Sequence, residues 1–216
     1  MSKYHTVLFD LDGTLLDTLG DLTDGVNYVL SRFSFEKRTK EEVRSFIGNG
    51  IPTLLRRSLP AGINDTLHSE AVKAFGEYYG KNLMNMTRPY PGIPELLDSL
   101  SAYGYKIGVV SNKKSDAVRE LCAYFFNKID IALGADGEHT RKPSPNLVFE
   151  ALSLLDSDKN SAVFVGDSDV DIMTAKNAGI DIICVGWGYR DTGFLKSWGA
   201  KAVVSDTSSL LELLTT

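Results

Sequence analysis

The stretch VLFDLDGTLLDT, Val7 to Thr18, places two carboxylates directly after a short hydrophobic run and follows them with a glycine. Val7 to Phe9 are residue types of a buried strand, so Asp10 and Asp12 stand where that strand ends. Gly13 and Thr14 fit a tight turn in which backbone N–H groups can approach an anion without a side chain intervening. The stretch therefore predicts a strand that delivers a polar site.

Similar apolar runs recur from about residue 90 onward, and amphipathic segments separate them. The runs are rich in Val and Ile and predict strands at 105–112, 128–135, 161–167 and 181–187, with a weaker one at 201–206. The segments between them predict helices at 94–104, 115–126, 145–156, 171–179 and 209–214. This alternation predicts an α/β fold with a doubly wound, mostly parallel sheet and helices on both faces.

The region between the first strand and this alternation has a different pattern. Apolar residues recur at helical spacing in 21–33 and in 69–84, Thr39 to Glu42 has capping-box spacing, and Pro52 stands near a helix start. The pattern predicts an all-helical cap domain at 17–88, inserted into a catalytic core formed by 1–16 and 89–216. Its hinges are expected near Asp17 and near residues 88–91.

Composition narrows the classes of function and the location. The chain has 216 residues, 43% of them hydrophobic and 24% charged, and a net charge of -5, which gives no general attraction to nucleic acid. The two cysteines stand in apolar stretches, which indicates free thiols in a reducing compartment. No run is long enough to cross a membrane, and Met1 to Asp10 lacks the pattern of a signal peptide. A cytoplasmic protein is expected.

Four polar segments follow predicted strands, and in a parallel sheet these ends share one crevice. They contain Asp10 and Asp12, Ser111 and Asn112, Arg141 to Pro145, and Gly166 to Asp171. Carboxylates crowded at one point repel one another unless a cation binds, and oxygen ligands suit Mg²⁺. The Ser111 hydroxyl, nearby backbone N–H groups and the Lys142 ammonium are donors for a phosphate. The sequence therefore predicts a magnesium site that binds a phosphate ester.

These motifs, in this order, resemble those of a known superfamily. DLDGT, SN, K followed by P, and GDSxxD look like the four motifs of the haloacid dehalogenase superfamily, over Val7 to about Val204. The helical block resembles the C1-type cap of that superfamily. GNGIPTLLRRSL at 48–59 and GWGYRD at 186–191 are similar to segments of the phosphoglycolate phosphatases. The resemblance implies a member of that subfamily.

The resemblance also implies a role for each motif residue. Asp10 would be the nucleophile that forms an aspartyl-phosphate, and Asp12 would protonate the leaving alcohol and later deprotonate water. Mg²⁺ would be held by Asp10, the Asp12 backbone carbonyl and Asp167, with Asp171 as an outer ligand. The phosphoryl group would be held by Gly13, Thr14, Ser111, Asn112 and Lys142.

Other positions carry weaker expectations. Asn49 and Arg57 in the cap segment are expected to contact substrate, whereas Arg56 fits a solvated helix face equally well. Asp169 is a further carboxylate to which the pattern assigns no role. Taken singly, SN after a strand is commonly a helix cap and KP a helix start, so the prediction depends on the motifs occurring together.

The expected function is Mg²⁺-dependent hydrolysis of a small phosphomonoester, with 2-phosphoglycolate as the leading candidate. Pyrophosphatase, nucleotidase and sugar phosphatase activities stay open. A phosphomutase would carry a basic residue where Ile51 and Pro52 stand, and a haloalkanoate dehalogenase would lack Asp12. A catalytically idle phosphate sensor or scaffold on the same fold is the alternative from another class. The expected partner is a small phosphorylated metabolite, without nucleic acid or membrane, and the protein could be a monomer or a homodimer.

Overall fold

The computed structural model describes residues 3–216. Met1 and Ser2, the start of the segment considered above as a signal peptide, lie outside the described residues. The chain divides into two compact units. One, called here the sheet unit, contains the chain up to Leu16 together with Pro89–Thr216, and the other, called the helical unit, is Asp17–Arg88.

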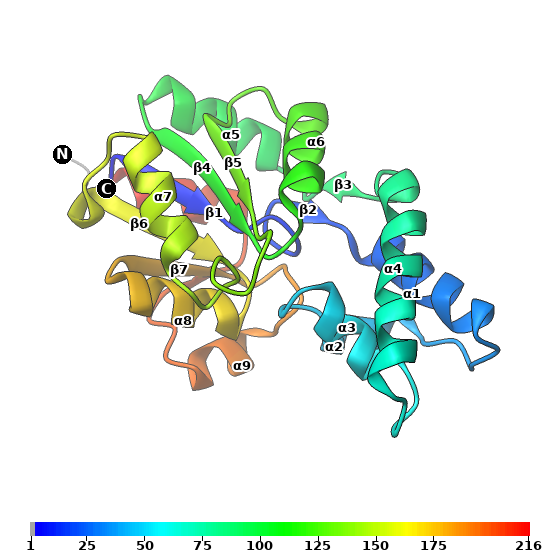
Figure 1. The fold of residues 1–216 in the computed structure, drawn as a ribbon. Helices are drawn as coiled ribbons and strands as arrows, with labels where there is room; N and C mark the ends of the chain where they lie inside the picture. Colours follow the sequence, from blue (N-terminus) through cyan, green and yellow to red (C-terminus); the bar gives the residue numbers. More distant parts are fainter. Residues whose placement is uncertain (1–2) are drawn as a thin grey trace. The chain divides into compact units, whose positions relative to one another are not determined.

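The sheet unit is built on a six-stranded parallel sheet of order β5-β4-β1-β6-β7-β8 (Figure 1). Its strands are β1 (Thr6–Phe9), β4 (Lys106–Ser111), β5 (Ile131–Gly134), β6 (Ala162–Gly166), β7 (Asp181–Val185) and β8 (Val203–Val204). The central strands β1 and β6 are fully buried, which explains their continuous apolar sequences. The α/β prediction of a mostly parallel sheet is confirmed.

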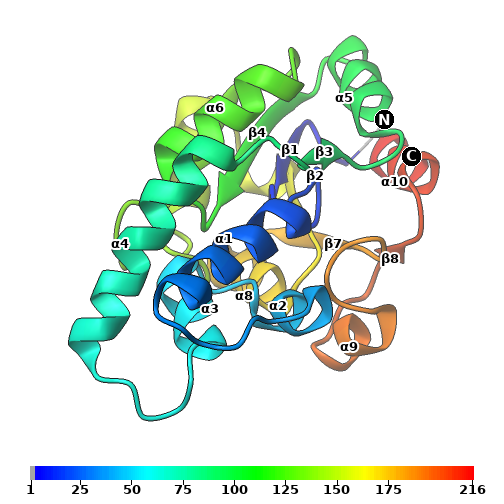
Figure 2. The same cartoon turned by 90° about the vertical axis from the view of Figure 1, so that its right-hand side faces the viewer.

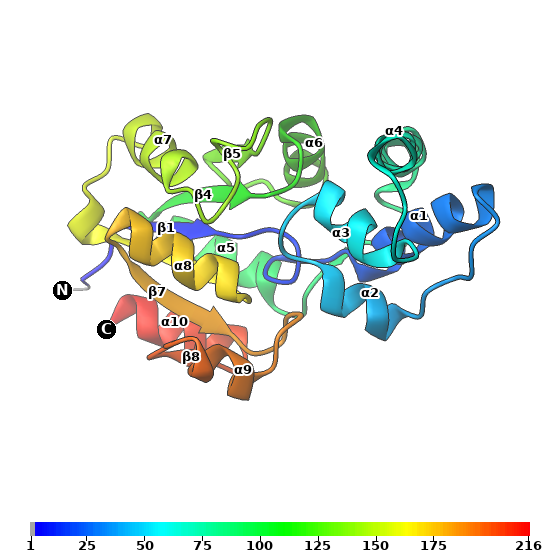
Figure 3. The same ribbon diagram turned by 60° about the horizontal axis from the view of Figure 1, so that its bottom comes forward.

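Helices cover both faces of this sheet. The helices of the sheet unit are α5 (Ile93–Ala102), α6 (Ser115–Phe125), α7 (Asn146–Leu154), α8 (Asp169–Ala178), α9 (Thr192–Ser197) and α10 (Thr207–Thr215), with a short 3-10 turn at Lys159–Ser161. Figure 3 shows α7 and α8 on one face, with α5 and α10 on the other. Helix α10 packs beside α5 (Figure 2). This arrangement leaves the carboxyl ends of the strands open for a site.

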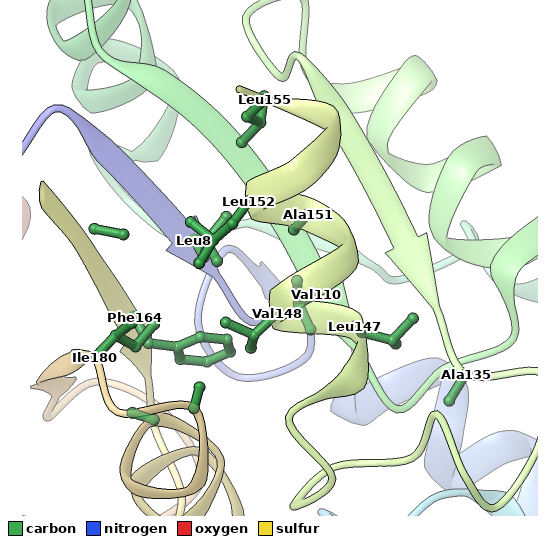
Figure 4. Packing of buried hydrophobic residues seen from close by; sticks show 13 residues of the cluster. Leu8, Val110, Ala135, Leu147, Val148, Ala151, Leu152, Leu155, Phe164 and Ile180 are labelled. Atoms are coloured by element: carbon green, nitrogen blue, oxygen red, sulfur yellow. The ribbon is translucent and has the colours of Figure 1, made fainter. Parts of the chain in front are cut away.

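The hydrophobic core between α7 and the sheet is formed by one face of that helix. Val148, Ala151 and Leu152 pack against Leu8 of β1 and Phe164 of β6 (Figure 4). Each of these five side chains is buried. Burying a large aliphatic or aromatic side chain contributes about 1.5–3 kcal/mol each, so this cluster fixes β1 and β6, the two strands that precede the aspartate motifs.

The helical unit contains α1 (Leu19–Arg32), α2 (Lys40–Phe46), α3 (Ile51–Ser58) and α4 (Asp65–Asn82). Helices α1 and α4 pack side by side (Figures 1 and 2). Thr39 and Glu42 form the predicted capping box, and the predicted proline lies in the first turn of α3. The segments that connect the two units, β2 (Leu16–Asp17) and β3 (Arg88–Pro89), pair as a two-stranded sheet.

Two helices differ from the expectation by more than two residues at an end or altogether. Helix α4 begins at Asp65, four residues before the periodic pattern, because the Asn64 side chain accepts a hydrogen bond from Leu67 N at 2.9 Å and caps it there. Helix α9 was not predicted, since its six residues are too short to show a period.

Cys122 and Cys184 are free and buried, as predicted. Burial raises the pKa of each thiol to about 12. Across residues 3–216, none of the helices is both apolar enough and long enough to cross a bilayer.

Candidate active site

Three of the predicted site residues lie at the carboxyl ends of three adjacent strands. Asp10 directly follows β1, Ser111 ends β4, and Asp167 directly follows β6. Since β1 pairs with β4 on one side and with β6 on the other, these three residues leave the sheet at one edge. The chain order reverses at β1, which is where open α/β sheets bind ligands.

Three carboxylates form a buried cluster at this edge. One oxygen from each of Asp10, Asp167 and Asp171 lies within 4.8 Å of the others. Burial, together with the neighbouring charge of Asp171, raises the pKa of Asp10 to about 7, although Lys142 opposes the change. The same causes raise the pKa of Asp167 well above its ordinary value. The cluster thus concentrates negative charge that water does not solvate.

Lys142 supplies the positive charge inside this cluster. Its Nζ lies 2.8 Å from Asp10 Oδ1 and 2.7 Å from Asp171 Oδ1, and its side chain is 2% exposed. Burial alone would lower the pKa of Lys142, but the attraction of Asp10 and Asp171 outweighs it and raises the pKa. The ammonium therefore stays charged and holds two carboxylates in place.

The second carboxylate oxygen of Asp171 holds the turn before α8 in place. Asp171 Oδ2 accepts hydrogen bonds from the backbone N–H groups of Asp167 and Ser168 and from the Ser168 hydroxyl. Ser168 in turn caps α8, accepting from Asp171 N. With the Lys142 ammonium on Oδ1 and three donors on Oδ2, Asp171 fits an outer position better than a direct metal ligand.

The remaining donor set suits a hard divalent cation. Asp10 Oδ1 is buried and, within residues 3–216, accepts no hydrogen bond of good geometry, despite its ion pair with Lys142. Buried carboxylate oxygens in this state are stabilised by a metal ion. Asp10 and Asp167, with the backbone carbonyl of Asp12, could hold Mg²⁺ here.

The cluster predicts how stability depends on pH. Because folding raises the pKa of Asp10 from 3.8 to about 7, the folded state binds more protons than the unfolded state in that window. Without metal, the stabilisation is present below pH 4 and is lost as pH rises through about 7. In chelator, we expect the difference in Tm between the wild type and Asp10→Asn to shift against the wild type as pH rises from 5 to 8. Mg²⁺ should raise the Tm of the wild type more at pH 8 than at pH 5. Parallel profiles for the two proteins would contradict this.

The loop after β7 holds Asp167, a role the sequence did not reveal. The N–H of Tyr189 donates to Asp167 Oδ2 at 2.6 Å, and the Thr14 hydroxyl donates to Asp167 Oδ1 at 3.3 Å. Trp187 Nε1 donates to the carbonyl of Thr14 at 3.0 Å. Trp187 and Tyr189 therefore tie the turn after β1 to Asp167.

Gly188 makes this close approach possible. A Cβ at this position would lie 2.3 Å from Asp167 Cβ and 2.4 Å from the carbonyl oxygen of Gly13. We expect Gly188→Ala to destabilise the protein by about 1–3 kcal/mol through overpacking, and to weaken metal binding by about 10–100-fold by displacing Asp167. Thermal unfolding and Mg²⁺ titration would measure both. Gly186→Ala is the matched control, because its nearest atoms would be 3.2 and 3.3 Å away. Equal effects of the two changes would refute the argument.

Asp12 is paired with a lysine that the sequence analysis did not single out. Lys113 Nζ lies 2.9 Å from both Asp12 Oδ1 and Asp12 Oδ2, and the lysine side chain is 4% exposed. The run SNKKSD at 111–116 looks like the solvated start of a helix. The sequence carries only one signal for this contact, which is position: Lys113 comes shortly after β4 and Asp12 shortly after β1, and these two strands are neighbours.

The other predicted phosphate-binding residues lie at this edge with defined contacts. Ser111 is buried, and its hydroxyl accepts from Lys113 N at 3.3 Å. The Asn112 side chain contacts the backbone of Lys142, accepting from its N–H at 2.6 Å and donating to its carbonyl at 3.2 Å. Asn112 therefore places Lys142. Gly13 adopts a φ of 87°, as a tight glycine turn requires.

Three further positions lie outside the carboxylate cluster. Asp169, to which the sequence assigned no role, is 3.8 Å from Arg190. In the helical unit, Arg57 donates to Asn49 Oδ1 at 3.2 Å and to the carbonyl of Phe46 at 2.9 Å. The two predicted substrate residues of that unit therefore contact each other.

Comparison with known proteins agrees with this arrangement. The family model of haloacid dehalogenase-like hydrolases matches residues 7–185. The chain is 35% identical to a phosphoglycolate phosphatase of Aquifex aeolicus over 86% of each chain. It is 32% identical to one of Haemophilus influenzae over 99% of each.

Solved structures show the same fold over the whole length. A Lactobacillus delbrueckii protein for which phosphoglycolate phosphatase activity is predicted superposes with a TM-score of 0.94 at 32% identity, covering 99% of this chain and 100% of its own. A Haemophilus somnus protein with the same predicted activity gives a TM-score of 0.90 at 28% identity, covering 99% of each chain. The chain belongs to the haloacid dehalogenase-like hydrolase family.

Proposed function

We propose that this hydrolase is a Mg²⁺-dependent phosphatase that cleaves a small phosphomonoester through an aspartyl-phosphate on Asp10, with 2-phosphoglycolate as substrate. The observation that carries the proposal is the buried cluster of Asp10, Asp167 and Asp171 around Lys142, with Asp12 two residues beyond Asp10. The names of the curated relatives support this substrate. Mg²⁺, when bound, would neutralise phosphoryl and carboxylate oxygens and so allow two anions to meet.

The residues of the chain perform two steps. Asp10 attacks phosphorus, the bond from phosphorus to the leaving oxygen breaks, and Asp12 gives that oxygen a proton. Asp12 then takes a proton from water as the water attacks phosphorus, which frees Asp10 and releases inorganic phosphate. Lys142 and the backbone N–H groups after Asp10 neutralise charge on the phosphoryl oxygens throughout.

The helical unit is proposed to act as the cap that selects the substrate, with Asn49 and Arg57 near its substrate-contacting surface. A cap that closes over a small substrate would exclude water during transfer and reopen for release. A small phosphorylated metabolite and two free thiols fit a cytoplasmic location.

Steady-state phosphate release tests the proposal. The panel is 2-phosphoglycolate, a hexose phosphate, a nucleoside monophosphate and pyrophosphate, each with Mg²⁺ and with chelator. We expect the highest kcat/KM for 2-phosphoglycolate and loss of activity in chelator. Similar low kcat/KM values for every ester would overturn 2-phosphoglycolate as the substrate but would support phosphatase activity. Absence of metal-dependent release from all four would overturn the phosphatase itself.

A further inference from the structure

Lys113 is the one buried ion-paired lysine outside the carboxylate cluster among the described residues, and its partner is Asp12. Both carboxylate oxygens of Asp12 lie 2.9 Å from the same Nζ. The Asp12 side chain is 17% exposed and that of Lys113 only 4%, so the carboxylate is partly open to solvent while the ammonium stays covered. A lysine solvated on a helix face would not have this geometry.

The backbone of Lys113 is fixed at both of its polar atoms. Its N–H donates to the Ser111 hydroxyl at 3.3 Å, and its carbonyl accepts from Ala135 N at 2.9 Å. Gly134, the last residue of β5, allows this approach, because a Cβ there would lie 2.5 Å from the carbonyl oxygen of Lys113. The backbone of Lys113 is thus held by Ser111 of β4 and by Ala135 just after β5, whereas Asp12 belongs to the turn that follows β1.

We propose that Lys113 is a positioning residue that fixes the Asp12 carboxylate for the step in which water hydrolyses the aspartyl-phosphate. This inference rests on the proposed function and deepens it. In that step Asp12 must be a carboxylate aimed at water, and a charge-assisted pair to both of its oxygens holds it in one orientation. The proton of water passes to Asp12, the water oxygen bonds to phosphorus, and the bond from phosphorus to Asp10 breaks.

A substrate with a good leaving group separates the two steps. p-Nitrophenolate leaves without a proton, so phosphorylation of Asp10 by p-nitrophenyl phosphate does not need Asp12, whereas hydrolysis does. In Lys113→Met, rapid mixing should give a burst of nitrophenolate approaching one equivalent per enzyme. A steady-state rate lowered about 10–100-fold should follow. Phosphorylated Asp10 should accumulate and be seen by mass spectrometry after an acid quench.

A double-mutant cycle keeps the test independent of folding. Removing Lys113 alone takes away the ammonium that contacts Asp12, while Lys113→Met combined with Asp12→Asn removes both charges. If Lys113 acts through Asp12, the double variant hydrolyses the aspartyl-phosphate at the same rate as Asp12→Asn. Lys114→Met is the matched control, since the adjacent Lys114 is exposed, and it should keep wild-type kinetics without a burst.

The outcomes separate the inference from the function on which it rests. A wild type without Mg²⁺-dependent release from p-nitrophenyl phosphate would overturn the proposed function. An active wild type, with a Lys113→Met variant whose phosphorylation and hydrolysis rates fall together, would overturn the positioning role and leave the phosphatase intact. A further loss on adding Lys113→Met to Asp12→Asn would do the same.

Discussion

Replacing Asp10 with asparagine is expected to lower phosphate release by about 10⁴-fold or more, because an amide cannot form the acyl-phosphate on which both steps depend. The change is nearly isosteric and removes one negative charge from the cluster with Asp167 and Asp171. The fold should therefore remain. In chelator at pH 8 the variant should unfold at the same temperature as the wild type or higher, since less like-charge repulsion is buried.

Asp169→Asn is the matched control for this change. Asp169 is a carboxylate of the same motif, but it faces Arg190 at 3.8 Å and is not a member of the cluster. Its replacement should change turnover by no more than a few-fold. Mass spectrometry after an acid quench should detect a phosphoryl group on the peptide containing residue 10 in the control and not in Asp10→Asn. Residual turnover above one hundredth of wild type in Asp10→Asn would contradict the nucleophilic role.

Replacing Lys142 with methionine should damage both stability and turnover. Lys142 is 2.8 Å from Asp10 and 2.7 Å from Asp171, and its removal leaves two buried carboxylates without a counter-charge. Breaking a buried pair in this way costs about 3–5 kcal/mol of unfolding free energy. Loss of one preorganised positive charge at the phosphoryl group should lower kcat by about 10²–10³-fold.

The loss of stability in Lys142→Met should depend on pH and on metal. It should be largest in chelator at pH 8, and smaller at pH 5, where the carboxylates take up protons. Urea unfolding at both pH values measures it. Lys176→Met is the control, because Lys176 is exposed in the last turn of α8. A stability loss in Lys142→Met that is independent of pH would contradict the electrostatic explanation.

Local pattern predicted much of the fold and of the site. Strands such as β1 and β6 are wholly buried, so their apolar runs are visible in sequence, and the polar residues that follow them mark the carboxyl edge. Asp10, Asp167 and Asp171 were therefore predicted and do lie together. Their roles in catalysis stay predictions.

Residues whose contacts depend on strand pairing or loop packing were harder to recognise from the sequence. Lys113 and Lys114 are chemically alike, and only the pairing of β4 with β1 and with β5 decides that Lys113 is buried against Asp12. Gly188 looks like an ordinary loop glycine until the loop is packed on Asp167. Tertiary packing, which no local period encodes, determines both.

The pairing of β2 with β3 makes residues 17–88 an interchangeable module. Leu16 and Pro89 stand on adjacent strands, and Tyr90 N donates to the carbonyl of Leu15 at 3.1 Å, so the insertion begins and ends at one point of the sheet unit. An insertion with adjacent ends adds little constraint to the fold that receives it. The helical unit can therefore lengthen, shorten or change its sequence while Asp10, which directly follows the buried strand β1, keeps its place. Under the proposed role of the helical unit as the cap, exchanging this unit would change the substrate without rebuilding the chemistry.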